Sequence, residues 1–131
     1  MAIVFAPLKP IRIVRGTAWS DNFQLVDKAT GDPVPLTPLA AMVMRIRKSI
    51  NGPILLELSL DNGRLIVVDA PTGMGGFRCD SATTLSLPEF GNRRAKYIYD
   101  AVLERTAGEY EPAVTGKLTV SPSITRPWGV T

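Results

Sequence analysis

The sequence predicts one all-β domain of about seven or eight short antiparallel strands, arranged as a sandwich or a small barrel. Apolar and polar residues alternate with a period of two through most of the chain, which is typical of strands with one buried face. The 11 prolines and 11 glycines gather mainly between the alternating stretches, where turns are expected. At 131 residues, the chain has the length of a single domain with a sizeable core.

The first strands are expected at residues 11–15 and 17–26. The second of these stretches places three large apolar residues on one side of an extended chain and mainly polar residues on the other. These three residues are Trp19, Phe23 and Leu25. Residues 27–33 have the composition of a turn, and the prolines around residues 34–38 exclude a central strand from that segment.

Three further strands are expected at residues 41–48, 54–60 and 64–69. The first of them alternates methionine and isoleucine with valine and arginine, so its arginines should lie on the side opposite to the core. Between the second and the third, Asn62-Gly63 predicts a hairpin turn, because both residues accept positive φ angles at little cost.

The glycine-rich segment 73–76 is interpreted as another turn. A phosphate-binding loop would need a following lysine with serine or threonine and then a helix, and neither is present here. A short strand is expected at 77–79. Residues 80–87 predict at most one short helical turn, which Asp80 or Ser81 would cap.

The strongest strand is expected at residues 95–105, and it should pair back through a turn onto residues 114–120. Alternation in this strand separates an inward row from an outward row. The inward residues are expected to be Tyr97, Tyr99, Ala101 and Leu103. Asp100 and Glu104 then face outward, which is the usual position for an acid on a half-buried strand.

Few residues are available for catalysis or metal binding. The chain has no histidine and one cysteine, Cys79, which we interpret as a small buried apolar residue. No histidine can activate a serine or threonine, and the carboxylates do not form a convincing pair. We therefore expect a protein that is not an enzyme and that uses no catalytic residues, metal or cofactor.

The charge of the chain is nearly balanced. Fifteen basic and 12 acidic residues give a net charge of +3, which does not favour nucleic acid as a partner. No apolar run reaches the length of a membrane span, and residues 1–8 lack the basic start of a signal peptide. We expect no nucleic-acid or membrane partner and synthesis in a reducing cytosol, since one cysteine forms no internal disulfide.

The two ends of the chain are interrupted by prolines and differ from the middle. We expect an N-terminal arm at residues 1–10, a β-sandwich domain at 11–120 and a C-terminal arm at 121–131. The arms carry apolar residues that would suit contact with a partner. The candidate partner-binding residues are Ile3, Phe5, Leu8, Arg126 and Trp128. Trp128 either anchors a partner or folds back as a plug on the sandwich.

Several segments occur in a familiar order. The domain opens with Ile13-Val14-Arg15-Gly16-Thr17-Ala18-Trp19, and Pro35-Leu36-Thr37 and Met44-Arg45-Ile46-Arg47 follow. Later segments are Tyr97-Ile98-Tyr99-Asp100-Ala101-Val102-Leu103 and, near the end, 116–126. This order resembles small immunoglobulin-like β-sandwich proteins of tailed bacteriophages, over roughly residues 11–126.

The resemblance implies an immunoglobulin-like β-sandwich and a non-enzymatic structural role in the virion. Such a protein would join neighbours or attach fibres at the tail, collar or baseplate. Its partners would be other virion proteins and copies of itself, and it would form a homo-oligomer in the assembled particle. The alternatives are a capsid decoration protein, a carbohydrate-binding β-sandwich module that uses exposed aromatic residues, and a small hydrolase. The protein would be made in the host cytoplasm and located in the virion.

Overall fold

The computed structural model describes residues 3–6, 11–37, 41–88, 95–106 and 108–122. Over these residues the chain forms nine strands and two short helices. The strands are β1 (Ile3–Ala6), β2 (Ile11–Val14), β3 (Trp19–Asp27), β4 (Ala41–Arg47), β5 (Ile54–Ser59), β6 (Leu65–Asp69), β7 (Met74–Cys79), β8 (Ala95–Thr106) and β9 (Glu109–Ser121). The helices are the 3₁₀ helix η1 (Ala70–Thr72) and the α-helix α1 (Ser81–Leu85).

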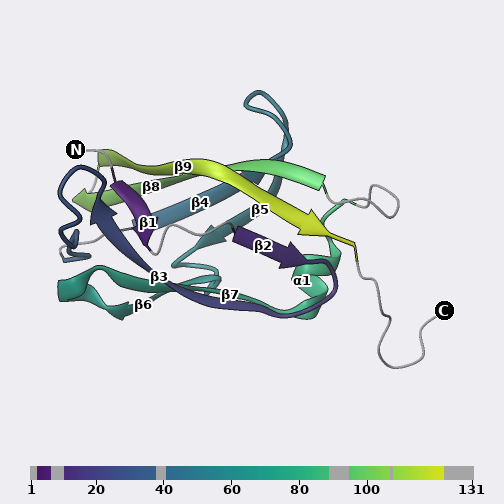
Figure 1. Ribbon diagram of the computed structural model, residues 1–131, viewed down its shortest axis with the longest axis horizontal. Coiled ribbons are helices and arrows are strands. Elements are labelled where there is room, and N and C mark those ends of the chain that lie inside the picture. The colour runs from purple at the N-terminus through teal and green to yellow at the C-terminus, as the bar shows by residue number, and fades with distance from the viewer. Residues whose placement is uncertain (1–2, 7–10, 38–40, 89–94, 107, 123–131) are drawn as a thin grey trace.

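The strands form two sheets, so the expected all-β class is confirmed (Figure 1). The four-stranded sheet has the order β1-β3-β7-β6, and the five-stranded sheet has the order β2-β9-β8-β4-β5. All described pairs are antiparallel except β2 with β9, which run parallel. The structure thus differs from the expectation in one parallel pair, one more strand and a second helical turn.

The start of the chain is divided between the two sheets, because β1 pairs with β3 and β2 pairs with β9. With that division, the strand orders resemble those of a variable-type immunoglobulin domain, although the described residues include no counterpart of its strand C″. A second feature of that fold is also present. Near the start of β8, the hydroxyl of Tyr97 donates a hydrogen bond of 3.4 Å to the carbonyl oxygen of Pro88, as in a tyrosine corner.

One hydrophobic core lies between the sheets and contains residues of both. Its largest fully buried side chains are Tyr97, Ile13, Leu25, Met44, Ile46, Leu58, Leu65, Leu87, Leu103 and Leu118. An aromatic group joins the two layers: Phe5 of β1 lies 4.7 Å from the ring centroid of Phe23 and 5.9 Å from that of Tyr99 in β8. The described residues contain no disulfide between the sheets, and Cys79 is a free, buried thiol.

The inward and outward rows expected for β8 are confirmed. Tyr97 and Leu103 have exposed fractions of 1% and 0%, and Ala101 is also buried. Trp19 and Cys79 are buried as expected, and Trp19 stacks on Phe77 at 4.5 Å. The alternation of apolar and polar residues therefore identified the core side of these strands correctly.

Two turn predictions are wrong. Asn62-Gly63 does not close a hairpin, because β5 and β6 belong to different sheets; Gly63 has the expected positive φ of 77°, but its turn crosses between the layers. The segment 73–76 is mostly strand. Only Gly73 has a positive φ, and Gly75 lies inside β7, where a Cβ atom would come within 2.6 Å of the ring of Phe23.

The helical turn expected at 80–87 is confirmed as α1. Asp80 caps it by accepting a hydrogen bond of 2.8 Å from the backbone N–H of Thr83. Hydrogen bonding to the side chain of Thr83, and after it to this backbone N–H, lowers the pKa of the Asp80 carboxyl. Thr84 is fully buried and ties α1 to the turn between β2 and β3. Its hydroxyl donates to the carbonyl of Thr17 at 2.7 Å and accepts from the N–H of Gly16 at 3.0 Å.

Candidate functional site

The structure describes two of the five residues expected to bind partners, and both lie in the sandwich. Ile3 is 3% exposed, and Phe5 packs against the core from β1. The expectation that no strand precedes residue 11 is therefore wrong, because four residues before the first prolines are enough for a short strand beside β3. Leu8, Arg126 and Trp128 lie outside the described residues, so their roles stay predictions.

The five-stranded sheet presents one face outward, and the register of its strands sets which side chains share that face. Ala41 pairs with Glu104, Val43 with Val102, and Arg45 with Asp100 across β4 and β8. Residues between these positions, such as Met44 and Leu103, point into the core. On the outer face, the apolar pair Val43 and Val102 therefore lies between two pairs that carry charged residues.

A hollow of about 330 Å³ opens on this outer face. Ala41, Val43 and Val102 provide apolar walls, and Tyr110 at the start of β9 lies beside them. Tyr110 is 70% exposed, which is unusual for so large an aromatic side chain. Tyrosine combines apolar area with a hydroxyl, a combination enriched in protein–protein interfaces.

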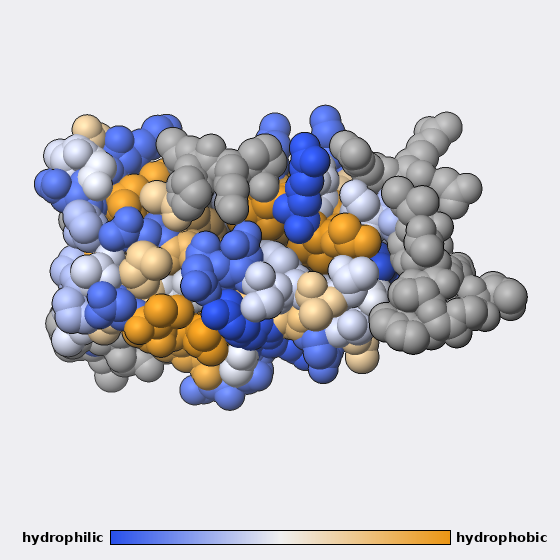
Figure 2. Space-filling view, turned by 60° about the horizontal axis from the view of Figure 1, so that its bottom comes forward, coloured by the Kyte–Doolittle hydropathy of each residue, from blue (hydrophilic) through white to orange (hydrophobic). Residues whose placement is uncertain are grey.

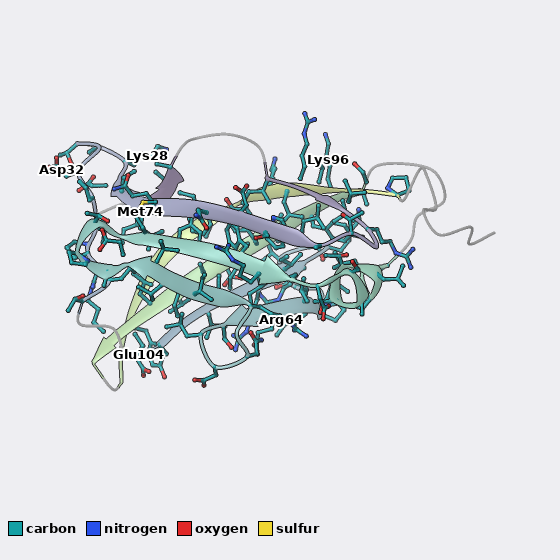
Figure 3. All side chains as sticks on the ribbon, turned by 90° about the horizontal axis from the view of Figure 1, so that it is seen from below. Lys28, Asp32, Arg64, Met74, Lys96 and Glu104 are labelled. Atoms are coloured by element: carbon teal, nitrogen blue, oxygen red, sulfur yellow. The ribbon has the colours of Figure 1, made fainter. Side chains whose placement is uncertain are left out.

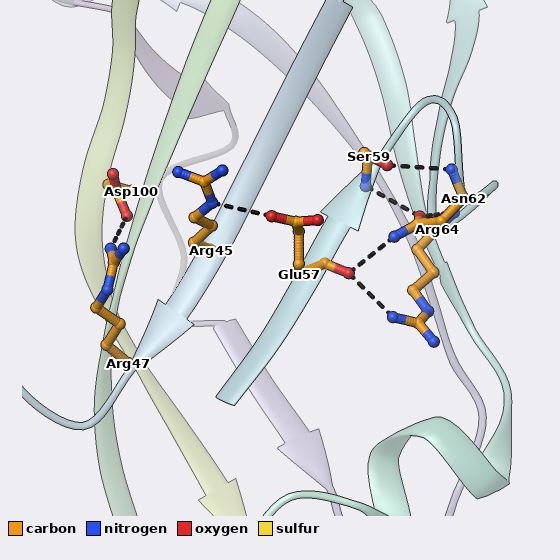
Figure 4. Close-up of polar contacts among 7 residues, drawn as sticks. All are labelled: Arg45, Arg47, Glu57, Ser59, Asn62, Arg64 and Asp100. Atoms are coloured by element: carbon orange, nitrogen blue, oxygen red, sulfur yellow. Dashed lines mark hydrogen bonds and ion pairs between the residues drawn. The ribbon is translucent and has the colours of Figure 1, made fainter. Parts of the chain in front are cut away.

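Two ion pairs cross the same face (Figure 4). Arg45 contacts Glu57 of β5 at 2.9 Å, and Arg47 contacts Asp100 of β8 at 3.1 Å. Glu57 and Asp100 are nearly half exposed, so water screens both pairs and each contributes about 0–1 kcal/mol to stability. Their main effect is to hold the side chains around the hollow in place.

The charges of this face are separated along the strands. Figure 3 shows Lys96 and Glu104 toward opposite ends of β8. Lys117 of β9 pairs with Ile98, close to Lys96, and Arg12 of β2 pairs with Thr119, the partner of Lys96. One end of the face is therefore rich in cations, and the end with Glu104 is acidic.

A second hollow, of about 450 Å³, lies beside α1 and includes Arg64, Arg78 and Cys79 in its lining. Both arginines already donate to the fold: Arg78 donates to Asn22 Oδ1 at 2.7 Å and Arg64 to the carbonyl of Glu57 at 3.0 Å. Burial raises the pKa of Cys79 to about 11, so this thiol stays protonated near neutral pH. Among the described lining residues, the two arginines thus have structural contacts and the thiol is not activated.

The remaining exposed apolar residues are dispersed. Figure 2 shows the side of the molecule that includes the four-stranded sheet, where apolar surface appears in separate patches among hydrophilic residues. Val67 and Val68 of the edge strand β6 are 39% and 48% exposed. Over the described part of the chain, no group of three or more histidine, cysteine, aspartate or glutamate residues is placed to hold a metal ion. No described helix is long and apolar enough to cross a membrane.

Sequence reasoning missed the surface formed by Val43, Val102 and Tyr110. A weak signal was present, because Val43 and Val102 are apolar residues on the outward side of strands whose inward side is also apolar. Their proximity depends on the register of β4 and β8, which alternation alone does not give. No protein-family model matches the sequence, and a search of curated proteins finds no relative.

Proposed function

We propose that this chain is a non-enzymatic structural protein of a tailed-bacteriophage particle, and that it joins neighbouring virion proteins through the outer face of its five-stranded sheet. The observation that carries the interaction role is the open hollow beside Tyr110, whose ring is 70% exposed. Exposed aromatic residues next to apolar walls are common at the energetically important centres of protein interfaces.

The assignment to a virion is supported by the sequence resemblance to immunoglobulin-like phage proteins, and an immunoglobulin-like strand order is consistent with it. A shared fold does not define a function, so the surface has to supply the argument for binding. The described face offers apolar walls at Val43 and Val102, ordered ion pairs around them, and charges of both signs. This combination suits contact with another folded protein.

A carbohydrate-binding module is the second candidate, and one observation favours it. Tyr110 lies beside Asp100 and Glu104 in the hollow, and a sugar ring could stack on the aromatic face while its hydroxyls donate to the carboxylates. Glycan-array binding by the isolated protein that is lost in both Tyr110→Ala and Asp100→Asn would favour this candidate over the structural role.

The virion assignment is tested on purified particles. The phage whose genome carries this gene is grown, its particles are separated from soluble lysate on a density gradient, and the chain is quantified by mass spectrometry. A structural protein should be found in the particle fraction at a fixed ratio to the major capsid protein. A chain that is abundant in the soluble lysate and missing from intact particles would contradict the proposal.

A further inference from the structure

The outer face of the five-stranded sheet carries its charges in two separate halves. The half toward the end of β8 contains three carboxylates and one guanidinium among its described residues: Glu104, Asp100, Glu57 and Arg45. The other half contains only cations among its described charged residues: Arg12, Arg47, Lys96 and Lys117. The ion pair between Arg47 and Asp100 marks the boundary between the halves.

We propose that this face docks onto the same face of a second copy of the chain. The two-fold axis would lie in the interface and run perpendicular to the strands, so that the strands of the two copies are antiparallel. This rotation places the acidic half of each copy over the basic half of the other. The inference rests on the proposed function, since it names a partner for the same surface.

The charge pattern selects one orientation of the two copies. Isologous contact repeats every interaction twice, so a favourable pairing of Glu104 with the basic half occurs at two places. Turning one copy by half a turn would bring acid onto acid and base onto base, and such like-charge contacts are costly. The pattern therefore favours a second copy in a defined orientation over non-specific association.

The apolar part of the face fits the same arrangement. Val43 and Val102 lie inside the acidic half, between Glu104 and Asp100, so they would face the basic half of the second copy, where their burial would exclude water. Tyr110 lies next to Glu104 in the register and would face the basic half of the second copy. A cation over an exposed tyrosine ring adds a favourable contact there.

Sedimentation equilibrium of the full chain tests the proposal. The wild-type protein should form a reversible dimer that weakens as salt is added, because exposed charges are screened. Glu104→Lys and Lys96→Glu should each raise the dimer dissociation constant about tenfold or more. The double variant, Glu104→Lys with Lys96→Glu, restores opposite charges across the axis and should recover most of the lost affinity.

Val68→Glu is the matched control, because Val68 is exposed on the other sheet and should leave the dimer unchanged. A protein that stays monomeric at all concentrations would overturn the proposal, and so would a double variant that dimerises no better than the single variants. Incorporation into particles distinguishes self-association through this face from the role in the virion. If Glu104→Lys abolishes dimers but enters particles normally, the self-association is unrelated to assembly, while the virion role stands.

Discussion

The ring of Tyr99 occupies the space that a side chain at Gly116 would need. The two residues are directly paired across β8 and β9, and a Cβ atom at position 116 would lie 2.5 Å from the hydroxyl oxygen of Tyr99. The same ring stacks on Phe5 in the opposite sheet. Gly116 thus allows an aromatic residue of one sheet to contact the other, and the contact also explains why burial raises the pKa of Tyr99.

Gly116→Ala should therefore destabilise the domain, because the new methyl group forces the ring of Tyr99 away from Phe5. Overpacking of this kind costs about 1–3 kcal/mol, and urea denaturation measures the loss. The neighbouring exposed substitution Thr115→Ala is the control and should have little effect. Combining Gly116→Ala with Tyr99→Leu should cost less than the sum of the two single changes; strict additivity would show that the two side chains do not compete for space.

The two sides of β8 should respond in opposite ways to charge. Leu103 has an exposed fraction of 0%, so Leu103→Asp would bury a carboxylate in the core and cost several kcal/mol of a total stability of about 5–15 kcal/mol. Soluble expression should be lost. Glu104→Lys, one residue further on the outward side, should still give a folded protein with a circular dichroism spectrum like that of the wild type. The reverse ranking would mean that the strand faces are exchanged.

The buried hydroxyl of Thr84 can be tested without changing the size of the side chain. Thr84→Val leaves the carbonyl of Thr17 and the N–H of Gly16 without their partner, and each unsatisfied buried group costs about 1–3 kcal/mol. Thermal unfolding should show a clear drop in the midpoint for Thr84→Val. Thr84→Ser keeps the hydroxyl and should lose much less; equal losses for both variants would assign the effect to packing.

The alternation of residues was sufficient to predict the all-β class and the core side of β8, because a period of two is a property of each strand alone. The sequence pattern did not predict that the turn at Asn62-Gly63 crosses between sheets. The residue types of a turn indicate its φ angles, but they do not indicate which sheet the next strand joins. The hollow beside Tyr110 was missed for a related reason. It depends on pairing between strands that are far apart in the sequence.

Because Asp80 caps α1, the free energy of unfolding should depend on pH in the acidic range. Hydrogen bonds from Thr83 lower the pKa of Asp80 below its ordinary value of 3.8. The ionised Asp80 therefore stabilises the folded protein fully at pH values above the ordinary pKa. This stabilisation is lost as the pH falls from the ordinary pKa through the lower pKa of the folded state. Urea denaturation from about pH 6 down to pH 3 should show less acid sensitivity in Asp80→Asn than in the wild type. An identical pH dependence in both proteins would exclude Asp80 as a contributor.

Particle incorporation shows whether the outer face of the five-stranded sheet mediates assembly. A phage that lacks the gene is complemented with the wild type, Val43→Asp, Tyr110→Ser or Val68→Asp, and the chain is quantified in purified particles. Tyr110 is 70% exposed, so its substitution removes contact area without endangering the fold. We expect Val43→Asp and Tyr110→Ser to be soluble and folded but depleted from particles, and Val68→Asp to be incorporated like the wild type. Normal incorporation of both Val43→Asp and Tyr110→Ser would show that this face does not mediate assembly.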